Sequence, residues 1–121
     1  MSRIGDNRIV RDAKIHPKAR EAIQTFQKVI RQELGELLFK LQLGVAPRMP
    51  KSRPMPLVGQ GVHELRVKDS SGICRAFYYL KSEDGILVFH AFAKRTQKTD
   101  ADDIAPGRRR LKEMLTHGKE S

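Results

Sequence analysis

Three segments of the chain carry cations that could bind a phosphate group. Arg66 and Arg75 lie in the stretch VHELRVKDSSGICRAFYYL, residues 62–80. A guanidinium presents a planar fork of donors that matches phosphate oxygens, and it stays charged at any cellular pH. The other candidates flank this stretch: Lys51 and Arg53 precede it, and Lys94, Arg95 and Lys98 follow it. A charged run after a strand is usually a solvated loop and is weak evidence by itself. The convergence of cations from three segments on one sheet is what favours a phosphate site.

The stretch 62–80 predicts a β-hairpin in which Arg66 faces Arg75. If the hairpin is symmetric about the loop KDSSG, the numbers of paired residues sum to about 141. Directly opposed like charges cost up to roughly 1 kcal/mol. Three explanations remain open. Glu64 lies diagonally and neutralises one arginine, the register is shifted by one residue, or both guanidiniums bind one anion.

The chemistry open to such a site is the cleavage of RNA without a metal. The sequence has no Cys/His set with metal-ligand spacing, no glycine-rich phosphate loop and no G-x-S-x-G motif. We therefore expect no cofactor. In RNA the substrate's own 2′-hydroxyl attacks the phosphate, so the protein needs only to stabilise the phosphorane and move protons. Arginines suit the first task, and a lysine whose pKa is lowered by neighbouring cations suits the second.

Helices are predicted to precede the hairpin. Residues 8–15 alternate weakly and favour a short first strand. Apolar residues then follow the helical period from 19 to 41, with a break near Phe26–Gln27, Pro17 in the first turn and Gly44 at the end. Residues 45–61 hold four prolines and two glycines, which predicts a connector without regular structure.

Three strands and a last helix are expected after the connector. The strands cover 62–68, 72–80 and 86–92; the last is apolar except at His90 and is predicted to be interior. A lone histidine in such a run is more often a hydrogen-bonded core residue than a base. Residues 100–118 favour a helix with Thr99 as N-cap and a kink or restart at Pro106-Gly107.

Composition indicates one domain, residues 1–121, with a polyanionic partner. The net charge is +10, and a small domain this basic usually binds nucleic acid or an acidic protein. No apolar run could span a bilayer or serve as a signal peptide. We therefore expect a cytoplasmic protein without membrane contact. The lone Cys74 is interpreted as a small core residue.

Several blocks together resemble the RelE/ParE superfamily of type II toxins, in its phage-derived HigB-like branch. The blocks are ELR, R-x-F-Y and F-x-K-R-T-Q-K-T, followed by RRRLKEML, and the resemblance covers residues 15–117. It implies an α+β fold: a small antiparallel sheet with the N-terminal helices on one face and a C-terminal helix. Ala93 and Pro106-Gly107 depart from the family's usual pattern, and the latter affects how the last helix docks.

The resemblance also implies a function. Relatives cleave mRNA in the ribosomal A site and are paired with a HigA-like helix-turn-helix antitoxin. By position, Arg66 and Arg75 would stabilise the transition state, and Lys94 would transfer a proton or bind substrate. The RNA-binding residues would be Lys51, Arg53, Arg95 and Lys98.

Two other functions remain open. ParE-like relatives poison DNA gyrase instead, although the concentration of cations at one place argues against this. A non-enzymatic module that binds nucleic acid or an acidic partner would show salt-sensitive binding without toxicity.

Overall fold

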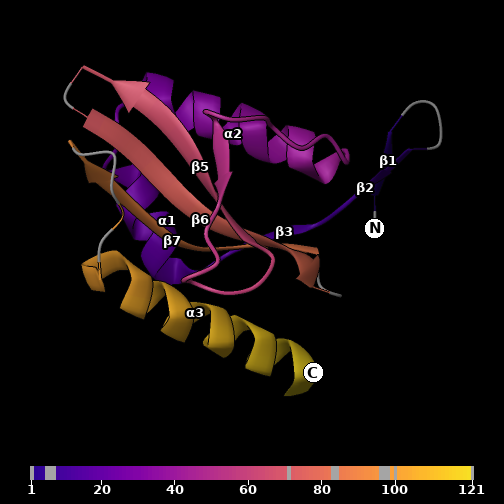
Figure 1. The fold of residues 1–121 in the computed structure, drawn as a ribbon. Helices are drawn as coiled ribbons and strands as arrows, with labels where there is room; N and C mark the ends of the chain where they lie inside the picture. Colours follow the sequence, from indigo (N-terminus) through magenta and orange to yellow (C-terminus); the bar gives the residue numbers. More distant parts are fainter. Residues whose placement is uncertain are drawn as a thin grey trace.

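The computed structural model describes residues 2–4, 8–70, 72–82, 85–95, 99 and 101–120, with side chains for 10–70, 72–80, 82, 85–95, 99 and 101–116. The elements are β1 (Ser2–Ile4), β2 (Arg8–Val10), β3 (Ala13–Ile15), α1 (Pro17–Gln24), α2 (Lys28–Gln42), β4 (Ser52–Pro54), β5 (Val62–Asp69), β6 (Gly72–Ser82), β7 (Gly85–Lys94) and α3 (Ala101–Glu120) (Figure 1).

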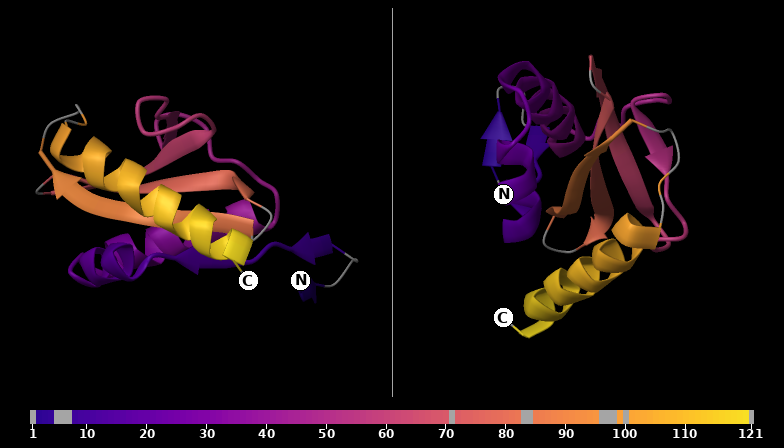
Figure 2. Two further views of the ribbon diagram at one scale, coloured as in Figure 1. Left: turned by 90° about the horizontal axis from the view of Figure 1, so that it is seen from below. Right: turned by 90° about the vertical axis from the view of Figure 1, so that its left-hand side faces the viewer.

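A five-stranded sheet in the order β3-β7-β6-β5-β4 forms the centre of the molecule. β1 and β2 form a separate two-stranded sheet. Helices α1 and α2 cover one face of the larger sheet and α3 lies on the other, as Figure 2 shows. The α+β class, the N-terminal helices on one face and the C-terminal helix are confirmed.

The sheet is mixed rather than purely antiparallel, and it is larger than predicted. β3 pairs with β7 in parallel, while the other neighbours are antiparallel. The predicted strand 8–15 is divided between the two sheets. The connector contains β4, so the prediction that it lacks regular structure is wrong at Ser52–Pro54. Proline is compatible with β4 because this strand lies at the sheet edge.

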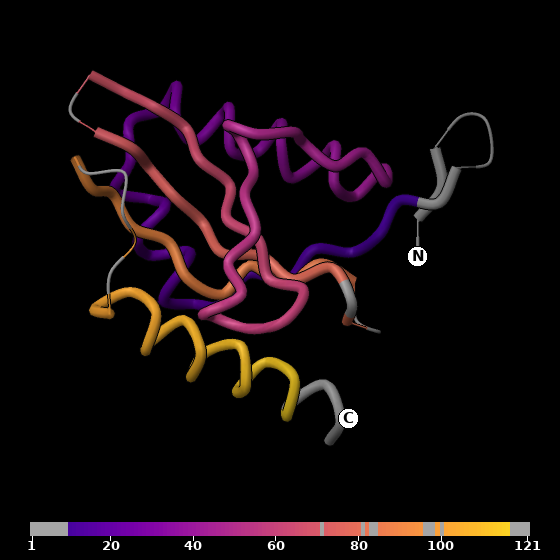
Figure 3. The backbone as a smooth tube through the Cα atoms, in the orientation of Figure 1, coloured from indigo at the N-terminus to yellow at the C-terminus, as the bar shows by residue number. Residues whose placement is uncertain are grey.

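The predictions for the two N-terminal helices are confirmed. Residues Thr25–Gln27 separate α1 from α2, Pro17 opens α1, and Gly44 follows α2 with φ +87°. Such a φ is favourable only for glycine. The buried residues of α2 recur at helical spacing: Ile30, Leu34, Leu37 and Leu41. Figure 3 traces the chain from α2 through the connector into β5.

Two cores lie on the two faces of the sheet. The core under α1 and α2 includes Cys74, whose thiol pKa is raised by burial to about 11. This confirms Cys74 as a core residue. The core under α3 contains Phe77, Phe89 and Leu111. Because β7 lies between β3 and β6, its predicted interior position is confirmed.

An irregularity in the β6–β7 pairing sets the direction of His90. Phe77 pairs with His90, whereas the next residue, Tyr78, pairs with Val88. β7 therefore has one extra residue at this point, as in a β-bulge. Phe89 joins the core under α3, and the His90 ring contacts the Phe77 ring at 5.4 Å. Both consecutive side chains thus face α3.

Helix α3 is continuous through Pro106, so the predicted restart is not observed. Gly107 lies against the Phe77 ring: a Cβ at this position would approach Phe77 Cδ2 to 2.9 Å. The glycine permits the close contact between α3 and the sheet. The described helix begins at Ala101, and the Thr99 hydroxyl bonds both Arg75 and Glu64. The predicted N-cap boundary depends on residue 100, which lies outside the described residues.

Candidate functional site

Arg66 and Arg75 face each other across β5 and β6, as the sequence predicts. Arg75 is in turn paired with Phe92 of β7. Residues paired in neighbouring strands point to the same side of a sheet, and Phe92 packs with the core under α3. Both arginines therefore lie on the face that α3 partly covers, and the shifted register is excluded.

One buried carboxylate, that of Glu64, forms ion pairs with both arginines. Glu64 Oε1 lies 3.3 Å from Arg66 Nε, and Glu64 Oε2 lies 3.8 Å from Arg75 Nη1. Thr99 Oγ1 donates to Glu64 Oε2 at 2.9 Å and accepts from Arg75 Nη1 at 2.7 Å. The predicted diagonal neutralisation by Glu64 is thus confirmed, and it applies to both guanidiniums.

Burial shapes the electrostatics of this group. It raises the pKa of the Glu64 carboxyl, against the lowering effects of the Thr99 hydrogen bond and of the nearby arginines. It also lowers the pKa of Arg75, which the Glu64 carboxylate partly offsets. The Arg75 side chain is 0% exposed, whereas that of Arg66 is 12% exposed. A ligand can therefore touch Arg66 directly but reaches Arg75 only by displacing the groups that cover it.

An ion pair to Asp103 holds Lys94, and two hydrogen bonds of His90 extend this second group. Lys94 Nζ lies 2.7 Å from Asp103 Oδ2, and Asp103 Oδ1 lies 3.1 Å from His90 Nε2. On the other side of the ring, Arg110 Nη1 lies 2.6 Å from His90 Nδ1. A guanidinium can only donate, so Nδ1 accepts and Nε2 carries the proton towards Asp103. Asp103 thereby positions the lysine ammonium from α3.

His90 is a hydrogen-bonded core residue, as predicted. It is 6% exposed. Burial lowers the pKa of its imidazole, and the Arg110 charge acts in the same direction, while Asp103 opposes them. A neutral imidazole agrees with these two hydrogen bonds, in which Nδ1 accepts from Arg110 and Nε2 donates to Asp103.

The Phe92 ring joins the two groups into one site. Arg75 Cζ lies 5.7 Å from the ring centroid, and Lys94 Nζ lies 5.8 Å from it. Both distances are within the range of a cation–π contact. The arginine pair and the lysine therefore share one aromatic neighbour.

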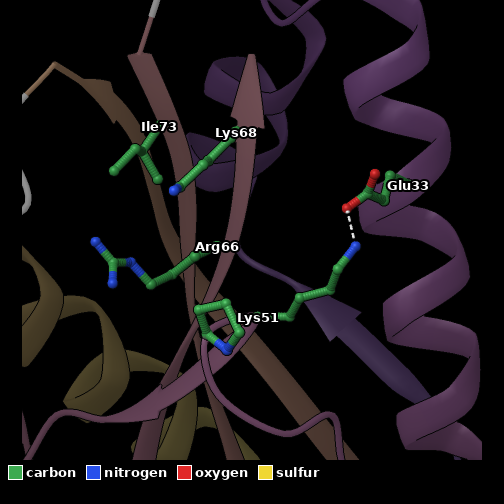
Figure 4. Close-up of a pocket in the computed structure, with 6 residues that line it drawn as sticks. Glu33, Lys51, Arg66, Lys68 and Ile73 are labelled. Atoms are coloured by element: carbon green, nitrogen blue, oxygen red, sulfur yellow. Dashed lines mark hydrogen bonds and ion pairs between the residues drawn. The ribbon is translucent and has the colours of Figure 1, made fainter.

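Not all predicted cations belong to this site. Arg53 does, because it pairs with Glu64 across β4 and β5. Lys51 forms an ion pair with Glu33 of α2 at 2.8 Å, and in Figure 4 it extends away from Arg66. Arg95 is exposed just after β7. Lys98 lies outside the described residues.

The structure adds residues that the sequence reasoning missed. Lys68 pairs with Ile73, which pairs with Lys94, so Lys68 lies on the same face. The alternation of β5 could have identified it. Thr99 and Asp103 could not have been found in this way, because tertiary structure alone brings them to the sheet. We call Arg53, Arg66, Lys68, Arg75 and Lys94 the cationic face; the carboxylates Glu64 and Asp103 lie among these five cations.

In the described part of the chain, no helix combines the length and apolar character needed to cross a membrane.

Comparison with known proteins identifies the family. No curated protein matches the sequence. Residues 21–112, most of the chain, match the family described as Phage derived protein Gp49-like (DUF891). A basic α+β domain with this match belongs to the phage-derived Gp49-like family, a family of toxin-like proteins.

Proposed function

We propose that the protein is the toxin of a type II toxin–antitoxin pair and that it cleaves mRNA on the ribosome. Its family is toxin-like, and its blocks resemble the RelE/ParE superfamily and the HigB-like branch. The cationic face carries the proposal: strands β4 to β7 bring five cations to one side of the sheet. Two carboxylates hold three of them, Arg66, Arg75 and Lys94, in place.

The proposed reaction is an internal transesterification. The 2′-hydroxyl gives up its proton to water, and its oxygen forms a bond to the adjacent phosphorus. The bond from phosphorus to the 5′-oxygen of the next nucleotide breaks, and that oxygen takes up a proton. The products are a 2′,3′-cyclic phosphate and a 5′-hydroxyl, with no net change in oxidation state. The ribosome would orient the RNA, since positioning supplies much of the rate.

Four members of the cationic face have a role in this proposal. Arg66 and Lys94, which are partly exposed, would bind the phosphate and stabilise the dianionic phosphorane. Lys94 would also donate the proton to the leaving oxygen. Arg75 would be a positioning residue, because it holds the Glu64 carboxylate that Arg66 contacts. Arg53 would contact the RNA backbone.

The proposed partners follow from the resemblance. A HigA-like helix-turn-helix antitoxin would neutralise the toxin, and the ribosome with bound mRNA would be its target. The enzyme would act in the cytoplasm, where translation occurs. A short neighbouring gene for a helix-turn-helix protein would support this pairing.

Induced expression tests the activity. We expect growth arrest and cleavage within translated mRNAs, with cyclic phosphate ends mapped by end-specific ligation and primer extension. Arg66→Ala and Lys94→Ala should each reduce cleavage by about 100-fold or more, the usual loss when one transition-state donor is removed. Lys112→Ala removes an exposed lysine of α3 and should leave cleavage unchanged.

Other outcomes of the same expression experiment would support one of the alternative functions. Growth arrest with intact transcripts would reject the nuclease. DNA-damage signalling with intact mRNA would indicate a gyrase poison. Salt-sensitive binding to nucleic acid without toxicity would indicate a non-enzymatic module.

A further inference from the structure

A pocket opens where β4 stops and β5 continues. The pairing of β4 with β5 ends at Ser52 and Leu65, although β5 runs to Asp69. Beyond that pair, the Arg66 N–H donates to the Lys51 carbonyl oxygen at 2.9 Å. The pocket at this edge has a volume of about 290 Å³ and is lined by Glu33, Pro50, Lys51, Arg66, Lys68 and Ile73 (Figure 4).

The lining of the pocket is cationic. Its lining includes three cations and one carboxylate, Glu33, which already forms the ion pair with Lys51. Figure 4 shows Arg66 and Lys68 extending in the direction opposite to Lys51. Lys68 is exposed and forms no ion pair with any residue that the structure describes. The pocket therefore attracts an anion.

The size and lining of the pocket suit a nucleotide. Its volume is close to the roughly 300 Å³ at which ligand pockets begin. Pro50 and Ile73 contribute apolar walls, and lysine stems add apolar surface below their charged ends. A mononucleotide unit combines one phosphate with a flat, largely apolar base, which matches this lining.

The pocket adjoins the cationic face. Arg66 belongs to both, and Ile73 lies between Lys68 and Lys94 in the strand register. A strand of RNA whose phosphate lies at Arg66 and Lys94 would continue directly into the pocket.

We infer that this pocket is a subsite for the nucleotide next to the cleaved phosphate. Lys68 binds the neighbouring phosphate, and Pro50 and Ile73 contact the sugar and base. This inference rests on the proposed function, because it takes single-stranded RNA as the substrate. Lys51, held by Glu33, borders the far side of the pocket and adds positive potential.

Direct binding tests the subsite. The probe is a short single-stranded RNA with 2′-O-methyl groups, which cannot be cleaved, and fluorescence anisotropy on the full chain measures its Kd at several salt concentrations. Lys68→Ala should weaken binding about fivefold at low salt. It should also reduce the slope of log affinity against log salt by about 0.7, the loss of one phosphate contact. Lys112→Ala is the matched control and should keep the slope.

The Glu33→Gln variant should change the affinity for RNA in the opposite direction. It removes the only carboxylate among the described lining residues, so RNA binding should tighten about twofold. Denaturant unfolding of each variant checks that the exposed substitutions leave stability unchanged.

Three results would overturn the subsite. They are a Lys68→Ala variant that binds RNA like Lys112→Ala, a Glu33→Gln variant that binds more weakly, and a polyglutamate peptide that competes as well as RNA of equal charge. The proposed cleavage is judged separately. Lys68-dependent binding without cleavage in cells would keep the subsite and reject the nuclease, whereas cleavage with unchanged Lys68→Ala binding would reject only the subsite.

Discussion

Glu64 and Arg75 are both completely buried, although both are ionisable. Removing a buried charge from water costs several kcal/mol per ion, so such a pair adds little stability by itself. Its effect is to fix positions: Glu64 holds Arg66 at 3.3 Å and accepts the Thr99 hydrogen bond. The buried pair thus determines where a partly exposed guanidinium meets a ligand.

Arg75→Met should therefore destabilise the fold while keeping its bulk. It leaves the Glu64 carboxylate buried with fewer compensating charges, which costs roughly 3–5 kcal/mol. Urea unfolding at pH 7 measures this loss. Adding Glu64→Gln should recover part of it, because the uncompensated charge is then gone.

The loss of stability caused by Arg75→Met should also depend on pH. Burial already raises the pKa of Glu64 above 4.5 in the folded state, and removing Arg75 raises it further. A carboxyl with a raised folded pKa reduces stability as pH rises from the unfolded value through the folded one. At about pH 3, well below the unfolded value of roughly 4.3, Glu64 is protonated in both states, so the electrostatic penalty of Arg75→Met should be small. An equal loss at both pH values would contradict this account.

At the scale of elements, the docking of α3 determines the geometry around Lys94. Asp103 belongs to α3 and contacts Lys94 at 2.7 Å, while Gly107 brings the helix against Phe77. The departure from the family pattern at Pro106-Gly107 is thus compatible with close packing. Proline removes one helical hydrogen bond near the start of α3, and the glycine allows the contact.

Two glycine substitutions should have opposite effects. Gly107→Ala places a methyl group 2.9 Å from a buried ring carbon, and such overpacking costs about 1–3 kcal/mol. Gly35→Ala on α2 has no described atom within 4 Å of the new Cβ, so it should gain up to about 1 kcal/mol of helix propensity. Thermal unfolding of both variants compares them; a stabilised Gly107→Ala would show that the contact with Phe77 is loose.

At the scale of the whole molecule, charge acts on folding and on binding in opposite ways. The net charge of +10 repels itself in the compact state and attracts polyanions. Salt screens both effects, with a Debye length of about 10 Å at 0.1 M. The same property that favours RNA binding therefore limits stability at low salt.

Added salt should stabilise the free protein and weaken its RNA complex. Raising NaCl from about 20 mM to about 200 mM should increase the unfolding temperature by a few degrees. Over the same range the affinity for RNA should fall. Thermal unfolding and anisotropy measure the two changes. A falling unfolding temperature would mean that ion pairs such as Lys94–Asp103 outweigh the repulsion.

Local rules were sufficient for much of the fold. Helical periodicity located α1 and α2 and the break between them, because buried residues of a helix must recur on one side. The symmetry of a tight hairpin set the register that pairs Arg66 with Arg75. Strand alternation then placed both on one face, and it would also have placed Lys68 there.

Contacts between distant segments were decided only by the tertiary structure. Thr99 meets a carboxylate 35 residues away, and His90 and Lys94 meet Asp103 on a helix that packs across the sheet. The parallel addition of β3 and the pairing of β4 likewise depend on how the whole sheet closes. No periodicity encodes such meetings, because they follow from the joint packing of elements. The cations and the nearby Glu64 could therefore be read from the chain, but Asp103 and Thr99 could not be assigned to them until the layers had come together.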